Sequence, residues 1–111
     1  MMKCPKCQNS IICLVSIRTE DDKLPIETSY QWWECKFCGA KYCAILEDSN
    51  VNVFDDRLEH KGYEIEETRW QETLVWARQC PDEGNTSCKC KVHNEVPPVG
   101  FYGAAAWYTY D

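Results

Sequence analysis

Two pairs of cysteines constrain this chain more than any other feature of its sequence. Cys4 and Cys7 form the first pair and Cys35 and Cys38 the second, with 27 residues between the pairs. Four thiolates from two tight turns can surround Zn²⁺ as a tetrahedron with Zn–S bonds of about 2.3 Å. Gly39, directly after the second pair, supplies the positive φ that such a turn favours. The spacing therefore predicts a closed zinc site formed by these four cysteines.

Cysteine usage also bears on the compartment. The chain has nine cysteines in 111 residues. It begins Met1-Met2-Lys3, and its N-terminal region shows no apolar stretch typical of a secretion signal or a membrane span. Without export, many cysteines indicate metal or redox chemistry, and an odd number argues against a fully paired disulfide framework. We expect a reduced, cytoplasmic protein.

Composition and charge limit the class of partner. Hydrophobic residues make up 44% of the chain and aromatic residues 13%, which is enough for a packed core. The formal net charge is −6, and the lysines lie scattered among acidic residues. Nucleic-acid-binding domains usually present a basic patch, so we expect neither nucleic acid nor membrane as partner. An acidic surface suits a basic protein partner, or serves solubility alone.

The first half of the chain has β character. Residues 11–17 are short and β-branched, residues 26–33 alternate, and residues 41–47 are largely apolar. The alternation places Ile26, Tyr30 and Trp32 on one face of the second strand, and Glu27, Ser29 and Gln31 on the other. Glu20 to Pro25 is expected to be an acidic turn. Because two of these strands are apolar on both faces, the rest of the chain has to cover them.

The second half is the expected cover. Residues 49–54 suggest a short strand before a charged turn at Asp55-Asp56, and residues 100–110 suggest a final strand. The stretch 63–79 is ambiguous: a helix would place Trp70, Leu74 and Ala77 on one face, but its β-branched and aromatic residues favour strands, which we prefer. We therefore predict a small, mainly β, zinc-stabilised domain over 1–111, with a zinc ribbon over 1–47 and a β-rich extension over 48–111.

A second group of ligand-type residues lies in this extension. Cys80, Cys88, Cys90 and His93 fall within a loop, 80–93, that is rich in Pro, Gly, Asn and Ser. Three cysteines and one histidine form a normal shell for structural zinc. The alternatives are free loop thiols with an exposed His93, or a Cys80–Cys90 disulfide under oxidation. His60 could replace His93 as ligand, although its charged surroundings favour a surface position.

Cys13 and Cys43 remain outside both groups. Each follows a cysteine pair at a similar distance and lies inside an expected strand, so the two could face each other across the sheet. Free cysteine behaves as a small buried hydrophobe, which makes core packing the default and a redox pair the alternative.

Catalysis is not expected. A closed four-cysteine shell, or a closed Cys₃His shell, leaves zinc no position for a reacting water. The sequence contains no nucleophile-and-base motif, no glycine-rich phosphate loop and no dinucleotide fingerprint.

The first 47 residues resemble the zinc-ribbon superfamily, and two of its families are similar in part. Residues 2–7, Arg18, Asp22 and residues 35–42 are similar to the N-terminal ribbon of bacterial repressors of ribonucleotide reductase genes. That family carries an arginine run before its second knuckle, where this chain has residues 28–34 without arginine. The resemblance therefore does not imply DNA binding here.

The other similar family is that of the transcript-cleavage elongation factors. Residues 18–22 resemble their acidic hairpin tip, with Asp21 and Asp22 at the acidic pair that would help to hold a catalytic Mg²⁺ in RNA polymerase. Residues 48–111 resemble no family that we can name.

Three functional hypotheses follow. The first is a zinc-stabilised protein-binding module, in its most specific form an inhibitor or immunity partner of a basic enzyme such as a nuclease toxin. The second is a transcription-associated ribbon that acts through Asp21 and Asp22. The third is a thiol redox or metal sensor that uses Cys13, Cys43 or the second cluster.

Overall fold

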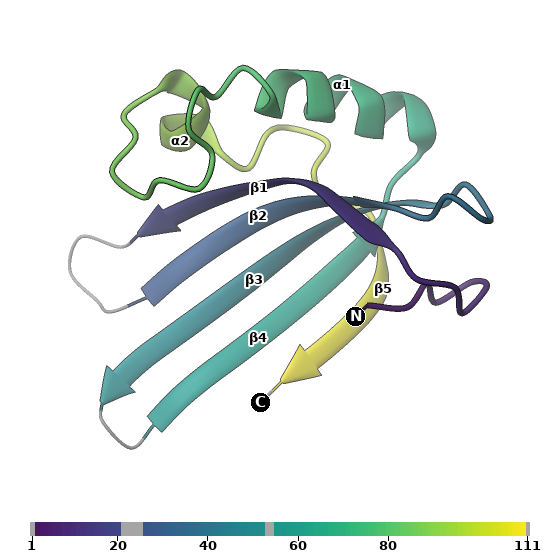
Figure 1. Ribbon diagram of the computed structural model, residues 1–111, viewed down its shortest axis with the longest axis horizontal. Coiled ribbons are helices and arrows are strands. Elements are labelled where there is room, and N and C mark those ends of the chain that lie inside the picture. The colour runs from purple at the N-terminus through teal and green to yellow at the C-terminus, as the bar shows by residue number, and fades with distance from the viewer. Residues whose placement is uncertain (1, 21–25, 53–54, 111) are drawn as a thin grey trace.

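One antiparallel sheet organises the computed structural model, which describes residues 2–20, 26–52 and 55–110. Within these ranges the sheet has five strands, β1 (Ile12–Glu20), β2 (Ile26–Glu34), β3 (Lys41–Asn52), β4 (Asp55–Glu64) and β5 (Ala104–Tyr110). They lie side by side in the order of the sequence, each antiparallel to the next (Figure 1). The prediction of a small, mainly β fold is confirmed, and strands from both halves of the chain share one sheet.

The strands expected in the first half are present. In β2, Tyr30 and Trp32 pack into the main core, while Ser29 and Gln31 lie on the other face, as the alternation predicts. Register supports this division, since Trp32 pairs with Val15 of β1 and with Cys43 of β3. Residues on one face of β2 therefore share that face with their partners on both sides.

The boundary between β3 and β4 differs from the prediction. Ser49 to Asn52 does not form a strand of its own but is the end of β3, and Ser49 pairs with both Ile26 and Arg57. Asp55 and Asp56 begin β4 and are not in a turn. Residues 53–54, like the expected acidic turn at 21–25, lie outside the described residues.

Helix α1 (Glu67–Ala77) replaces the strand preferred for 63–79, so that prediction was wrong. The carboxylate of Glu66 accepts hydrogen bonds from the backbone N–H groups of Thr68 and Arg69, which satisfies donors at the start of the helix. Burial of Trp70, Leu74 and Ala77 on one face supplies the packing that overrides local β propensity. A second, short helix, α2 (Lys91–Glu95), follows. In the described part of the chain, no helix is long and apolar enough to cross a membrane.

Both helices lie on one face of the sheet (Figure 1). The main core lies between α1 and this face, and its largest fully buried side chains include Trp32, Trp70 and Phe101. The indole N–H of Trp32 donates to Thr73 Oγ1 at 3.0 Å, and that of Trp70 donates to the carbonyl of Tyr42 at 2.9 Å. Both buried indoles thus have an acceptor, and the two bonds fix α1 on β2 and β3.

The opposite face of the sheet is covered by its own aromatic side chains. The Trp107 ring lies directly over Gly62, where an added Cβ would come within 2.2 Å of the ring. Beside it, His60 is buried, with Nε2 2.9 Å from Gln31 Oε1, and the Trp33 indole donates to the same oxygen at 2.9 Å. The expectation that His60 is a surface residue is therefore wrong, because two indole rings and Gln31 shield it from water.

Thr73 provides a test of how α1 is held on the sheet. Replacing Thr73 by Val keeps the side-chain shape but leaves the buried Trp32 N–H without its acceptor. An unsatisfied buried donor costs about 1–3 kcal/mol, and we expect the free energy of unfolding in urea to fall by that amount. Thr73→Ser keeps the hydroxyl and should lose less. Equal stability of the two variants would contradict this role of the hydroxyl.

Candidate metal centres

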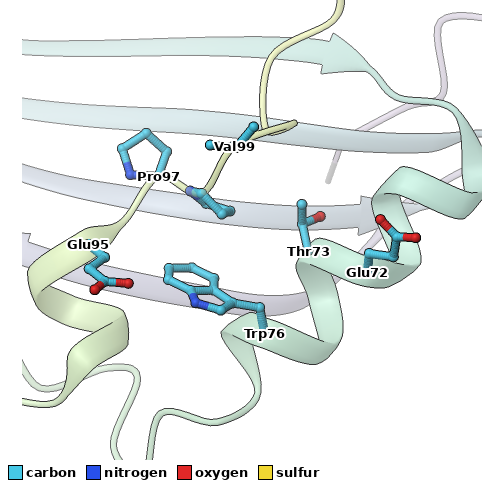
Figure 2. A pocket seen from close by; sticks show the side chains of 7 residues that line it. Glu72, Thr73, Trp76, Glu95, Pro97 and Val99 are labelled. Atoms are coloured by element: carbon cyan, nitrogen blue, oxygen red, sulfur yellow. The ribbon is translucent and has the colours of Figure 1, made fainter.

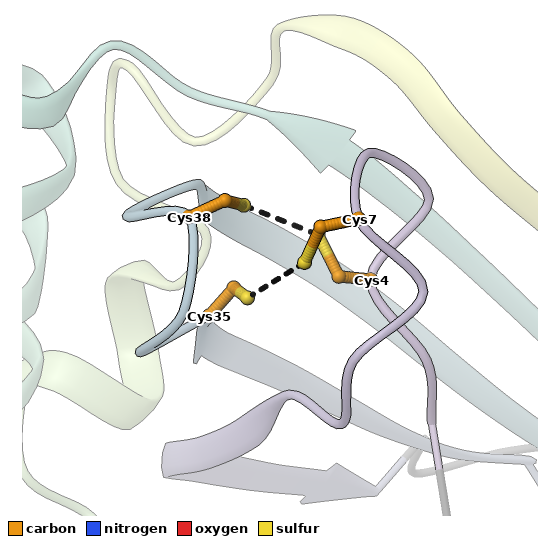
Figure 3. Close-up of side chains that lie close together, drawn as sticks. All are labelled: Cys4, Cys7, Cys35 and Cys38. Atoms are coloured by element: carbon orange, nitrogen blue, oxygen red, sulfur yellow. Dashed lines mark hydrogen bonds between the residues drawn. The ribbon is translucent and has the colours of Figure 1, made fainter.

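The two cysteine pairs of the N-terminal half meet at one point (Figure 3). Cys4 Sγ lies 3.6 Å from Cys38 Sγ, and Cys7 Sγ lies 3.5 Å from Cys35 Sγ. All four sulfur atoms lie within 4.8 Å of one another. Cys4 and Cys35 are buried, Cys7 is partly buried and Cys38 is exposed, so the cluster has an inner and an outer side.

The two turns that carry these cysteines have equivalent backbone hydrogen bonds. In the first, Gln8 N–H donates to the carbonyl of Cys4 at 2.8 Å, and in the second, Gly39 N–H donates to the carbonyl of Cys35 at 3.0 Å. Gln8 and Gly39 occupy equivalent positions and have φ values of +66° and +80°. The positive φ predicted at Gly39 is confirmed. The equivalent role of Gln8 has no sequence signal, because non-glycine residues rarely adopt that conformation.

Backbone and side-chain donors also point at the sulfur atoms. The Cys4 thiol has backbone hydrogen bonds from Lys6 and Cys7, and the Cys38 thiol has one from Ala40. Asn9 donates to Cys7 from its backbone and, at 3.4 Å, from its side-chain amide. Such donors stabilise thiolate charge and orient metal ligands, so the first cluster has the surroundings of a metal site and not those of ordinary buried thiols.

Tyr42, which the sequence alone does not single out, completes the inner side of this cluster. Its hydroxyl lies 3.1 Å from Cys4 Sγ, and its ring packs edge-on against Trp107. Burial alone would raise the pKa of Cys4, but the hydrogen bonds from Tyr42 and from the backbone outweigh it and lower this pKa to about 6. The only sequence signal for Tyr42 is its apolar strand position, four residues after Cys38.

The second predicted group is also brought together. Cys80 Sγ lies 4.0 Å from Cys88 Sγ and 3.1 Å from His93 Nδ1, and Cys90 Sγ lies 3.3 Å from the same nitrogen. Their four ligand atoms lie within 4.8 Å of one another, and the three cysteines are partly buried. Because Nδ1 faces the sulfur atoms, Nδ1 is the ring nitrogen of His93 placed to bind a metal.

The local structure explains how this loop gathers its ligands. Cys80 follows the end of α1, where its N–H donates to the carbonyl of Ala77 at 3.2 Å. Cys90 is the N-cap of α2, and its sulfur accepts from the N–H of His93 at 3.4 Å. Burial acts to raise the pKa of Cys90, but these hydrogen bonds with His93 and those with its neighbouring thiols lower it to about 6.

The spacing of the ligand atoms suits one ion in each cluster. A tetrahedron with metal–sulfur bonds of about 2.3 Å has edges of about 3.8 Å between sulfur atoms. The observed sulfur–sulfur distances of 3.5, 3.6 and 4.0 Å lie close to this value. Thiolate and imidazole ligands suit zinc, whereas Mg²⁺ and Ca²⁺ prefer oxygen. Each cluster can therefore hold a metal ion through four protein ligands.

The remaining predicted residues lie elsewhere. His60 is on β4, hydrogen-bonded to Gln31, and belongs to neither cluster. Cys43 is buried in the main core, as expected, but Cys13 is exposed. The two thiols do not face each other: Cys13 pairs with Trp33 and Cys43 with Trp32, which point to opposite faces. A β-bulge between Cys13 and Val15 turns Cys13 away from the core. Asp21 and Asp22 fall outside the described residues.

Comparison with known proteins supplies no family. No family model matches the chain, and neither a curated protein nor a solved structure matches it.

The hydroxyl of Tyr42 gives a specific prediction for the first cluster. Loss of one hydrogen bond to a ligating sulfur should weaken metal binding there by about tenfold, the low end for changes next to metal ligands. We expect Tyr42→Phe to show this loss in competition with a chromophoric chelator, while the second cluster keeps its affinity. Tyr102→Phe removes an exposed hydroxyl and is the matched control. Unchanged affinity at both clusters in Tyr42→Phe would contradict the assignment.

Proposed function

We propose that this chain is a protein-binding module held in shape by two zinc ions, and that its partner is a basic protein. The observation that carries the proposal is the completeness of both ligand sets, since each cluster gathers four ligand atoms within 4.8 Å. Zinc with four protein ligands has no free position for a substrate or a reacting water, which is typical of structural sites. The metal then contributes folding free energy, and function belongs to the protein surface.

In this proposal the first 47 residues are a zinc ribbon. The first cysteine turn precedes β1, the second connects β2 to β3, and β1, β2 and β3 form one antiparallel sheet. A zinc ion between the two turns would fasten the N-terminal segment to the β2–β3 connection. Burial of Ile11, Ala40 and Tyr42 with Cys4 and Cys35 provides a small core around this site.

The second zinc ion would stabilise the cover of the sheet. Cys80 lies just after α1 and Cys90 caps α2, so one ion would connect both helices. The loop between them contacts the edge strand β1, where the backbone N–H of Arg18 donates to the carbonyl of Glu83 at 2.9 Å. Without the ion, the 13 residues from 78 to 90 would have few apolar contacts to order them.

The charge of the molecule supports a basic partner. With a formal net charge of −6 and no basic patch in its sequence, the protein attracts cationic surfaces and repels nucleic acid. The specific form of the proposal is an inhibitor of a basic enzyme, such as the immunity partner of a nuclease toxin. Small size, acidity and the lack of a catalytic motif suit that role.

The rate of association with the partner should depend on the salt concentration. We expect affinity capture with the zinc-loaded protein from a nuclease-treated native lysate to retain one basic protein in stoichiometric amount. Complementary charges speed association, so raising the ionic strength from low to high should slow it by about tenfold or more. Surface plasmon resonance with the purified partner measures both rates. A complex whose association rate is indifferent to ionic strength would contradict the proposal.

A further inference from the structure

A pocket of about 380 Å³ lies between α1 and the segment that follows α2 (Figure 2). Trp76 and Thr73 line it from α1, and Pro97 and Pro98 from the other segment. Thr73 is buried and bonded to Trp32, so the inner end of the pocket is rigid. The Trp76 ring packs against the main core and leaves part of its surface to the pocket.

Two carboxylates border this pocket, Glu72 on α1 and Glu95 at the end of α2. No ion pair or side-chain hydrogen bond joins either of them to another residue of the described chain. The Arg69 side chain, which lies beside Gly100 in the same segment, donates to the carbonyl of Tyr102 at 3.1 Å. The negative charge at the pocket is therefore not compensated from within the described residues.

The indole ring and the two carboxylates together favour a cation as the ligand. An indole face attracts a cation that lies over it, and two carboxylates attract the same charge. An anion would be repelled, and a purely apolar ligand would desolvate the carboxylates without pairing them. A divalent metal ion would need about six oxygen ligands, which walls of indole and proline rings do not offer.

A metal ion in the second cluster would make the pocket rigid. Trp76 lies four residues before Cys80, and Glu95 lies two residues after His93. Both walls of the pocket are thus attached to the same cluster, on its α1 side and on its α2 side. A pocket whose walls are already ordered loses little conformational entropy on binding.

We propose that this pocket, here named the Trp76 pocket, binds an arginine side chain of the partner. A guanidinium group is planar, stacks on an indole ring and pairs with carboxylates in two-pronged fashion, which an ammonium group does not do. Val99, which lines the pocket, is 100% exposed, so an apolar contact is available beside the charged one. The identity of the occupant as part of a basic protein rests on the proposed function.

The test uses the zinc-loaded protein and two small probes. In ¹H–¹⁵N spectra, the indole N–H signal of Trp76, assigned with Trp76→Phe, is followed during titration with N-acetyl-arginine amide and with its uncharged counterpart, N-acetyl-citrulline amide. We expect a saturable shift with the arginine probe alone. Absence of a saturable shift, or an equal response to the citrulline probe, would overturn the proposal.

Charge-matched variants identify the carboxylates that are responsible. Glu72→Gln combined with Glu95→Gln should weaken binding of the arginine probe by about tenfold or more, because both attractive charges are lost. Glu20→Gln combined with Glu67→Gln removes two exposed carboxylates outside the pocket and should leave the affinity unchanged. Equal affinity of both double variants would contradict the proposal. Unchanged positions of the other indole signals verify that each variant is folded.

The captured partner separates this inference from the proposed function. If a basic protein binds wild type and the control variant equally well but the pocket variant more weakly, both proposals stand. If it binds all three equally, the Trp76 pocket is not the contact and only this inference fails. If wild type captures no basic protein, the proposed function fails, and the arginine titration alone decides whether the pocket binds this side chain.

Discussion

Sulfur atoms held 3.5–3.6 Å apart impose the main physical constraint on this molecule. Four thiolates at that separation repel one another strongly unless a cation lies between them. A metal ion removes the repulsion, and the backbone donors around Cys4, Cys7 and Cys38 then stabilise the remaining charge. A metal ion in this cluster would fasten the start of β1 to the β2–β3 connection. It would thereby anchor the sheet at the end where its first three strands meet the two turns.

The second cluster would act in the same way on the two helices that cover the sheet. The indoles of Trp32 and Trp70 fix the middle of α1 through hydrogen bonds, whereas the loop from 78 to 90 meets the sheet at Glu83, whose carbonyl accepts from the backbone N–H of Arg18. A metal ion bound by Cys80, Cys88, Cys90 and His93 would order this loop and set the position of α2. It would thereby also shape the Trp76 pocket, so that stability and recognition meet in one part of the chain.

Sequence patterns grouped the candidate ligands because metal chemistry restricts residue type and spacing. They predicted β1 to β3 because β-branched content, apolar runs and alternation are local properties of the sequence. The helix at 67–77 was not predicted because Leu74, Val75 and Trp76 have β character and Glu66 is an unusual cap. Only burial of Trp70 against the sheet decides the conformation of this segment. The exposure of Cys13 was not predicted because a single bulge in β1 turns its side chain to the other face of the sheet. Tyr42 lies against Cys4, and the Trp76 pocket lies between α1 and the segment after α2. A single sequence does not show that these distant segments come together.

The most direct test of this account is near-ultraviolet circular dichroism of the reduced protein before and after complete metal removal, with the metal content measured on the same samples. We expect two zinc ions per chain at the start. We also expect loss of the aromatic signal as they are removed, because structural zinc in small domains contributes on the order of 10 kcal/mol of folding free energy. A protein that keeps its full spectrum after the last metal ion has gone would contradict the central claim.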